Sequence, residues 1–437
     1  MSETITATEA QATKAIFRRL VPFLMLCYFI AYVDRVNVGF AALTMNRDLG
    51  FSSTVFGTGA GIFFLGYFIF EIPSNLAVAR FGAGRWMMRI MLTWGIIAAA
   101  MAFVTGVKSF YAMRFALGLA EAGFFPGILF YLTLWFPNSY RGKIIGWFMA
   151  AIPISTIVGA PVSGLILGLD GTLGFRGWQW LYILEGLPAV ILAILVPFVL
   201  TDSPERARWL SPNARTWLIA RLAQERKERE AIEHFSIGKA LVDPRVLLLS
   251  LVYFGAIACT FGLGFWLPQI IKGMGLTNTQ TGFVTAIPYL FGMLGMLTIG
   301  RRSDRVGERR FHCAFGLVVG AAGLIASTLV TGHVATMVAF SVAAFGFLGS
   351  QPVFWAIPSS LLTGAAAAGG LALINAVGGL AGFLGPFVVG AIKDATGSYS
   401  WGMVAIAACA VVAAVIVVAL GESRAATAPA AMSRQSV

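Results

Sequence analysis

The chain has 437 residues, of which 58% are hydrophobic and only 11% charged, and its mean hydropathy is +0.83. A soluble domain carries about 25% charged residues, so this composition excludes a soluble globular protein and indicates a polytopic membrane protein. The formal net charge of +12 does not indicate nucleic-acid binding, because the basic residues are spread over short segments between apolar runs.

Twelve apolar segments follow one another along the chain, and each is long enough, at about 20 residues, to cross a hydrocarbon core of about 30 Å as a helix. The first begins near Leu20, lacks a small-residue cleavage site and runs into charged residues, so we expect a retained span rather than a signal peptide. The predicted spans are residues 20–43, 55–79, 85–106, 109–135, 142–168, 177–201, 244–272, 280–300, 310–331, 334–361, 366–392 and 399–420. The sequence therefore predicts an all-α membrane protein.

The basic residues predict the orientation of these spans. Most of the 31 Lys and Arg residues fall on one side of the predicted membrane, and the other side carries Arg47, Lys108, Arg176, Lys272 and Lys393. Because loops rich in Lys and Arg stay in the cytoplasm, we expect both termini to be cytoplasmic.

Two predicted spans contain charged residues. Asp34 and Arg35 lie in the first span, and Arg114 and Glu121 lie in the fourth. A charged group at mid-bilayer costs roughly 3 kcal/mol, so such residues are usually buried in protein or in a wet cavity and usually have a function. They favour a transporter over an anchor, and a fixed structural ion pair among the four is the alternative.

Spacing predicts different roles for the polar residues of the first span. Tyr32 and Arg35 are three residues apart and share a helix face, whereas Asp34 is turned by about 100° from Arg35. A guanidinium fork matches a carboxylate in two-point geometry. We therefore predict that Arg35 and Tyr32 bind the substrate and that Asp34 carries a proton.

In the fourth span, Arg114 and Glu121 are seven residues apart on one face, and Gly118 between them leaves room for another helix. We expect Arg114 to pair with an acid and tune its proton affinity. Glu121 is the second predicted proton carrier, because a carboxyl in a low-dielectric bundle can hold a proton until a nearby charge changes. Glu71 and Glu185 lie nearer span ends or beside Gly and Pro, and we expect them to hydrogen-bond to neighbouring helices.

Histidine and cysteine chemistry is not expected. The histidines lie in loops or at span edges, at His234, His312 and His333. The cysteines lie within or at the edge of apolar segments without metal-ligand spacing, at Cys27, Cys259, Cys313 and Cys409. We therefore predict small core cysteines, no metal site and no histidine proton relay.

A polar stretch, residues 202–243, separates a predicted bundle at 20–201 from another at 244–420, and residues 1–19 and 421–437 are predicted cytoplasmic tails. Within the stretch, Ser211 and Pro212 resemble an N-cap and first helical residue. The following residues place an apolar stripe (Trp217, Leu218, Leu222) above basic residues. This pattern predicts a helix on the cytoplasmic membrane face, acting as a tether or, alternatively, as a docking site for partners.

The two bundles are predicted to be repeats of each other. A shift of 225 positions superposes these residues: Gly57 on Gly282, Leu65 on Leu290, Arg80 on Arg305, Gly82 on Gly307, Arg85 on Arg310 and Pro161 on Pro386. Parallel repeats in transporters place the substrate between two halves at mid-depth and allow alternating access. The sequence therefore predicts two pseudo-symmetric six-helix bundles.

Polar and aromatic residues near prolines are the second-half candidates for substrate binding. They are Trp266, Gln269, Gln351, Trp355 and Asn375, of which the last lies among glycines. Proline breaks helices locally and exposes backbone carbonyls to a cavity. Each of these residues could equally pack between helices or at the membrane interface.

The most specific motif lies in the loop after the eighth predicted span. Residues 300–310, GRRSDRVGERR, resemble a loop signature of the major facilitator superfamily, and the first-half counterpart, NLAVARFGAGR at 75–85, has Ala79 in place of the acid. An Asp at the cytoplasmic end of a helix can hold Arg neighbours and a facing helix N-terminus, and so latch the inner gate. We predict gating roles for Arg80, Asp304 and Arg305.

Further segments resemble the anion:cation symporter family of organic-anion permeases, over essentially the whole chain. They are YVDRVN at 32–37, FEIPSN at 70–75, RFALGLAEAGFFP at 114–126, WLYILEGLP at 180–188 and FWLPQ at 265–269. The resemblance implies the major facilitator fold and a bacterial inner-membrane protein. It also implies uptake of a small organic carboxylate, such as tartrate or another hydroxy or aromatic acid, together with protons.

This resemblance implies no cofactor other than the proton gradient, and no enzymatic activity. The expected partners are the organic anion, protons and the lipid bilayer, and we expect a monomer. Ile152 stands where the sugar-acid permeases of this family carry glutamine, which disfavours a heavily hydroxylated sugar acid. No GxxxxGK[ST] loop occurs, which argues against an ATP-driven pump. A facilitator or exchanger without proton coupling, and a ligand sensor that does not transport, remain as alternatives.

Overall fold

The computed structural model describes residues 2–230, 242–361 and 364–420, and in these ranges twelve helices are long and apolar enough to span a membrane. Helices joined by short connections make up the described residues, and no strand occurs among them. The predicted all-α class and the predicted number of spans are therefore confirmed. The predicted C-terminal tail, residues 421–437, lies outside the described residues.

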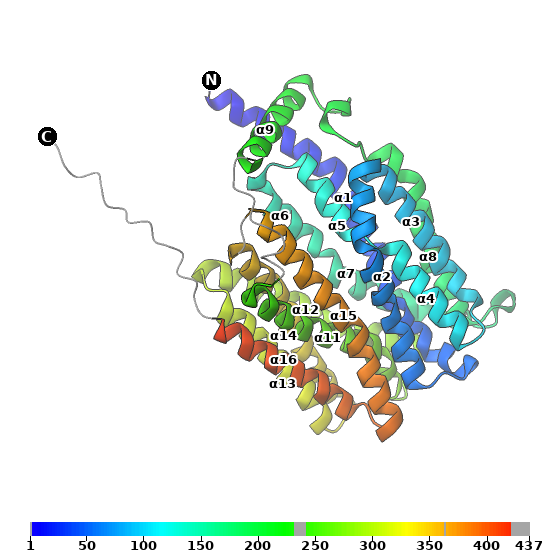
Figure 1. Cartoon of the computed structure of the whole chain (residues 1–437). Coiled ribbons are helices and arrows are strands. Elements are labelled where there is room, and N and C mark those ends of the chain that lie inside the picture. The colour runs from blue at the N-terminus through cyan, green and yellow to red at the C-terminus, as the bar shows by residue number, and fades with distance from the viewer. Residues whose placement is uncertain (1, 231–241, 362–363, 421–437) are drawn as a thin grey trace.

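The helices form two groups, which Figure 1 shows on two sides of one helical body. The first half contains α1 (Ser2–Leu49), α2 (Ser53–Phe81), α3 (Ala83–Ala100), α4 (Val107–Glu121), α5 (Phe124–Trp135), α6 (Asn138–Met149), α7 (Ala151–Ile166) and α8 (Gly177–Val199). The second half contains α11 (Pro244–Lys272), α12 (Asn278–Val306), α13 (Arg310–Leu329), α14 (His333–Leu361), α15 (Gly364–Thr396) and α16 (Ser400–Ala419).

The fourth span is interrupted, because α4 ends at Glu121 and α5 begins at Phe124. Gly123 makes the break with a positive φ of 83°, a conformation that side chains with a Cβ rarely adopt. A Cβ at this position would also lie only 2.3 Å from the Ser74 hydroxyl oxygen of α2. The break leaves the Glu121 carboxyl at the end of a helical segment inside the bundle.

The repeat is visible in the way the halves pack against each other. Gly57 of α2 meets α15, where a Cβ would lie 2.4 Å from the Pro386 carbonyl oxygen. Gly282 of α12 meets α7 in the same manner, with the Ala160 carbonyl oxygen 2.4 Å from a Cβ. Because Gly57 and Gly282 superpose in the repeat, the two helix crossings are related by the pseudo-symmetry of the halves.

Polar contacts also join the halves at the end far from the N-terminus of α1. The Asp394 carboxylate of α15 accepts hydrogen bonds from the backbone N–H groups of Ser53 and Thr54, at 3.0 and 2.7 Å. A carboxylate at a helix N-terminus is stabilised by the free N–H groups and by the helix dipole. Asn46 of α1 donates to Gln269 of α11 at 3.4 Å.

The predicted N-terminal tail, residues 1–19, is helical from Ser2 and continuous with the first span in α1. Ala12 and Ile16 of this extension are buried, and α9 (Pro212–Glu230) packs beside it (Figure 1). These contacts explain why the helix continues beyond the apolar span.

The linker helix α9 also differs from the expected membrane-surface helix. Its Leu218 is fully buried, and Trp217 and Leu222 pack against the protein core. Glu225 of α9 is 3% exposed and pairs with Arg141 of α6 at 3.6 Å. The apolar stripe of α9 therefore faces protein, because the extended α1 offers it buried apolar residues such as Ala12 and Ile16.

Candidate functional site

The four charged residues predicted in the spans lie inside the first half. Asp34 and Glu121 are 1% exposed and Arg114 is fully buried, while the Arg35 side chain is 13% exposed. The protein, rather than lipid, surrounds these groups, as the cost of a charge in hydrocarbon requires.

An ion pair joins the two spans, but its members differ from our expectation. Arg35 donates from Nη2 to the Glu121 carboxylate. Arg114 instead donates from Nε to the Gly59 carbonyl at 3.2 Å and from Nη2 to the Ala60 carbonyl at 3.1 Å. The expected pairing of Arg114 with an acid is therefore not seen.

Close helix packing explains this exchange of partners. Gly118 lets α2 approach α4 so closely that a Cβ on it would lie 2.0 Å from the Phe63 carbonyl oxygen. The approach brings backbone carbonyls of α2 to Arg114, and these satisfy part of its guanidinium. Glu121 at the end of α4 then turns to Arg35 on α1.

Aromatic rings surround the Arg35 guanidinium. Its Cζ lies 5.9 Å from the ring centroid of Tyr32, 5.4 Å from Phe63 and 5.5 Å from Tyr67. Arg35 Nε is buried and has no hydrogen-bond partner among the described residues. Arg35 thus keeps a donor for a further anion while one of its nitrogens holds Glu121.

Asp34 faces a different set of neighbours, as the spacing predicted. Trp94 of α3 donates from Nε1 to Asp34 Oδ2 at 2.7 Å, and Asn37 donates to Oδ1 at 3.5 Å. Glu185 of α8 lies within electrostatic range of Asp34 and accepts a hydrogen bond from the Ser163 hydroxyl of α7 at 2.7 Å. The predicted helix-to-helix hydrogen bonding of Glu185 is confirmed.

Three of the second-half candidates contact residues of other helices, and one of these contacts crosses between the halves. Asn375 of α15 donates to Glu71 of α2 at 2.9 Å, and Gln351 of α14 donates to the Thr260 hydroxyl of α11 at 3.2 Å. The Trp355 ring contacts Tyr253 of α11, with centroids 4.8 Å apart.

Tyr253 connects these side chains to the first half. It lies within electrostatic range of Arg35, Tyr32 and Glu71. Arg35 is therefore approached from both halves, with Tyr32 on its own helix and Tyr253 on α11.

The other two second-half candidates occupy different surroundings. Trp266 is fully buried, donates to the Pro386 carbonyl at 3.1 Å and packs edge-on against Phe56. Gln269 accepts the hydrogen bond from Asn46 at the end of the bundle. The structure thus contradicts the predicted pocket role of Trp266, because the ring fills the crossing of α11, α15 and α2, and it places Gln269 in a contact between the halves.

The predicted gating residues are exposed at the C-terminal ends of two helices, Arg80 in α2 and Asp304 and Arg305 in α12, beside the loops that lead to α3 and α13. Arg309 donates to Asp304 at 2.5 Å, so this acid binds an Arg neighbour within its own loop. Arg80 lies with its guanidinium 5.5 Å from the Phe81 ring, and Arg305 is exposed.

Acids also hold the N-termini of the helices that follow these loops. Glu308 accepts from the backbone N–H groups of Phe311 and His312, at 2.7 and 3.1 Å. Although burial acts in the opposite direction, these hydrogen bonds hold the pKa of Glu308 below its usual value. In the first half, Asp202 from beyond α8 accepts from the Gly84 N–H at 3.3 Å, so a distant residue supplies an acid beside the loop that lacks one.

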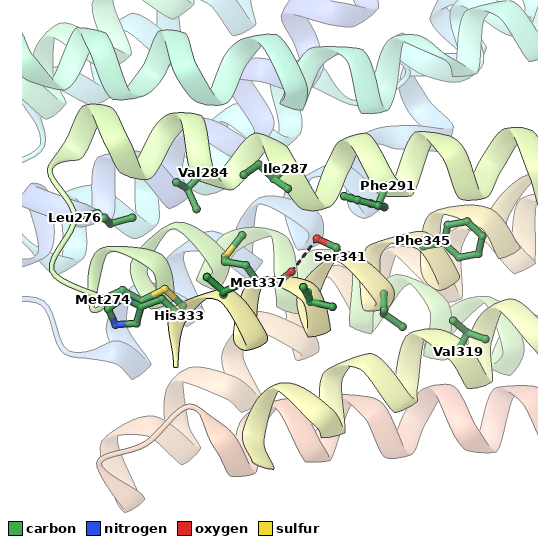
Figure 2. A pocket seen from close by; sticks show the side chains of 13 residues that line it. Met274, Leu276, Val284, Ile287, Phe291, Val319, His333, Met337, Ser341 and Phe345 are labelled. Atoms are coloured by element: carbon green, nitrogen blue, oxygen red, sulfur yellow. Dashed lines mark hydrogen bonds between the residues drawn. The ribbon is translucent and has the colours of Figure 1, made fainter. Parts of the chain in front are cut away.

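A cavity of about 680 Å³ lies elsewhere in the second half, between α12 and α14 (Figure 2). Figure 2 shows Met274, Leu276 and His333 at one end of it, and the Ser341 hydroxyl donating to a backbone carbonyl. Its walls are apolar, and its Phe291 residue is 45% exposed. None of the predicted substrate residues lines it.

Sequence reasoning missed several neighbours of the charged residues. Tyr67, Trp94 and Tyr253 contact or face Arg35 and Asp34, yet each lies in an apolar span rich in aromatic residues. Helical spacing could have indicated one of them, because Tyr67 is four residues from Phe63 and shares its helix face. Asp202 carries no local signal, since its partner is 118 residues away.

Comparisons with known proteins agree with this architecture. A family model described as Major Facilitator Superfamily matches residues 24–386 and, in a second match, residues 275–435. A "Putative tartrate transporter" of Agrobacterium vitis is 48% identical over 415 residues, which cover 95% of this chain and 96% of the relative. A "Quinolone resistance transporter" of Acinetobacter baumannii is 44% identical over 396 residues, which cover 90% of this chain and 91% of the relative.

Solved structures share the fold. A bacterial homolog of the human lysosomal transporter Spinster, in an inward-facing and unoccupied conformation, superposes with a TM-score of 0.76. The superposition covers 92% of this chain and 96% of that chain, with 16% sequence identity.

Proposed function

The chain belongs to the Major Facilitator Superfamily, and from this premise we propose that it takes up a small organic carboxylate together with protons. Membership makes the protein a multi-pass membrane transporter and not an enzyme. Its place in the bacterial inner membrane, with both termini cytoplasmic, and its action as a monomer without a cofactor are part of the proposal.

The observation that carries this proposal is the Arg35–Glu121 ion pair within the aromatic ring cluster. When Glu121 gains a proton, it loses the charge that holds Arg35. The guanidinium fork is then free to bind a substrate carboxylate at two points. Binding of the anion and binding of the proton therefore favour each other, which is what symport requires.

The chemistry around Arg35 supports a small carboxylate. Tyr253 from the second half, which lies within electrostatic range of Arg35, and Asn375, which donates to Glu71, offer neutral groups that suit the hydroxyl groups or second carboxylate of such a cargo, and we include Gln351 of α14 in the proposed site. A relative named "Putative tartrate transporter" is 48% identical to this chain. Tartrate is accordingly our first candidate substrate, followed by other hydroxy acids and by aromatic acids.

Two alternatives make different use of the same residues. In a facilitator or exchanger, Glu121 would remain ionised throughout, and Arg35 would have to hold two carboxylates at once. A sensor would bind the anion without moving it. The buried Asp34, which has no basic partner among the described residues, favours proton coupling over both.

Uptake into proteoliposomes tests the proposal. Purified protein is reconstituted and offered labelled L-tartrate, other hydroxy acids and aromatic acids, with and without an inward proton gradient. We expect accumulation of at least one carboxylate above its external concentration only when the gradient is present. Equal uptake with and without the gradient would identify a facilitator, and binding without uptake would identify a sensor.

A further inference from the structure

A second buried carboxyl lies next to Asp34 and is not used in the function proposed above. Glu185 of α8 is 5% exposed, and its Oε1 accepts the hydrogen bond from Ser163. Its Oε2 is buried and has no hydrogen-bond partner among the described residues. A buried carboxylate oxygen without a donor is costly.

Asn37 connects this carboxyl to Asp34. Its Nδ2 donates to Asp34 Oδ1 at 3.5 Å, and its side chain also lies within interaction range of Glu185. The Asn37 Oδ1 is buried and, like Glu185 Oε2, lacks a partner in the described part of the chain. Protonated Glu185 would have an O–H group to donate, and rotation of the Asn37 amide would present Oδ1 as its acceptor. One proton would thus satisfy two vacant hydrogen-bonding positions.

Neither Asp34 nor Glu185 has a basic partner among the described residues. Asp34 faces Glu185 from α1, and Tyr182 faces it from α8 itself. The elements α7 and α3 contribute neutral groups, the Ser163 hydroxyl and the Trp94 indole that donates to Asp34.

Both buried arginines are engaged elsewhere, Arg35 with Glu121 and Arg114 with backbone carbonyls of α2. Two neighbouring carboxylates without a cation repel each other and have lost their water. One member of the pair is therefore expected to be neutral.

We propose that Glu185 binds a proton and that Asn37 joins it to Asp34, so that the two acids form one proton-binding site separate from the Arg35–Glu121 pair. The inference rests on the proton-coupled uptake proposed above and adds a proton carrier on α8. Because the two carboxyls interact, their protons belong to the pair rather than to either residue alone.

Infrared spectroscopy tests the proton site without any substrate. The C=O stretch of protonated carboxyl groups is measured at pH 7 in lipid nanodiscs for wild type, Glu185→Gln and a control, Asp48→Asn. Asp48 lies at the end of α1 and accepts a hydrogen bond from the Trp178 indole N–H at 3.1 Å. Gln keeps the shape of Glu and can donate to Asn37, so the variant retains the hydrogen bonds of a protonated Glu185. We expect Glu185→Gln to lose the band of one carboxyl and Asp48→Asn to keep it. An unchanged band in Glu185→Gln would overturn the proposal.

Transport then tests whether this proton is coupled. With L-tartrate as probe and a gradient of one pH unit, each coupled proton raises the limiting accumulation ratio about tenfold. We expect Glu185→Gln to exchange tartrate and to accumulate about tenfold less than wild type. Accumulation equal to wild type would overturn the coupling role. If wild type itself does not respond to the gradient, the proposed function fails, and the infrared result still decides whether Glu185 holds a proton.

Discussion

The two halves of the molecule are repeats of one fold, yet their interiors differ in charge. The first half buries Asp34, Arg114, Glu121 and Glu185, and it nearly buries Arg35. Among the described residues of the second half, no Asp, Glu, Lys or Arg is buried, and the buried polar residues are serines and threonines, at Ser250, Thr281, Thr285, Ser303, Ser341 and Ser350. The two halves therefore share a pseudo-symmetric backbone but differ in the charge of their buried side chains.

This difference suggests how two halves with the same fold can have different functions in transport. Buried charges respond strongly to a single proton, because the surrounding dielectric is low. Neutral groups such as Gln351 and Asn375 respond to the shape and hydroxyl pattern of a cargo instead. We expect the first half to sense protons and the second half to select the anion, and the following variants test that division.

Neutralising the acids of the first half should have the largest effect. Asp34→Asn and Glu121→Gln are expected to abolish gradient-driven accumulation while substrate exchange is at least partly retained, since exchange does not require proton release. Both quantities are measured in the same proteoliposomes, with Asp48→Asn as the control. If both variants still accumulate substrate, the protons travel elsewhere and the comparison fails.

Arg35→Lys should reduce substrate affinity next. Lys keeps the positive charge but loses the two-point fork, so we expect a loss of about 2 kcal/mol or more, roughly 30-fold in Kd. Direct binding measurements in detergent give the affinity. Unchanged affinity would show that Arg35 does not clamp the carboxylate.

Arg114→Lys is the matched variant on α4 and should change stability rather than affinity. Lys cannot reproduce the two hydrogen bonds to the Gly59 and Ala60 carbonyls, so we expect a loss of about 1 to 3 kcal/mol in the free energy of unfolding. Thermal unfolding and binding are measured on the same sample. A loss of affinity equal to that of Arg35→Lys, with stability intact, would assign Arg114 to the substrate.

The loops after α2 and α12 allow a similar comparison at the end of the bundle that we predict to be cytoplasmic. If Asp304 latches the inner gate, Asp304→Asn should shift the resting population toward inward-open by about 1 to 2 kcal/mol, roughly 5- to 30-fold, and Ala79→Asp should act in the opposite direction. Cysteine accessibility from the cytoplasmic side, on a background without the four native cysteines, measures the shift. Equal labelling of wild type and Asp304→Asn would make Asp304 a surface charge only.

Gln351→Ala should have the smallest effect and should change selectivity. The variant loses a neutral hydrogen-bonding group beside Thr260, for which about 0.5 to 1.5 kcal/mol is expected. Competition between hydroxylated and aromatic carboxylates shows whether their ranking changes while proton dependence remains. A change in proton dependence without a change in ranking would contradict the assignment of selection to the second half.

The sequence by itself determined the twelve spans, the repeat and the burial of the charged residues of the first and fourth spans. The physical reason is that a bilayer demands apolar segments of a certain length and tolerates charges only inside protein. Helical spacing also correctly predicted that Asp34 and Arg35 have different neighbours, because the period of a helix determines which residues share a face.

Only the tertiary structure decided which partner each charged group takes. Gly118 brings α2 against α4, so Arg114 binds carbonyls and Glu121 binds Arg35 instead. Trp266 fills a helix crossing, α9 packs against α1, and Glu185 lies within interaction range of Asp34 and Asn37. The helical period defines the faces of each helix, but close packing between segments distant in sequence determines which faces meet, and no local pattern records that choice.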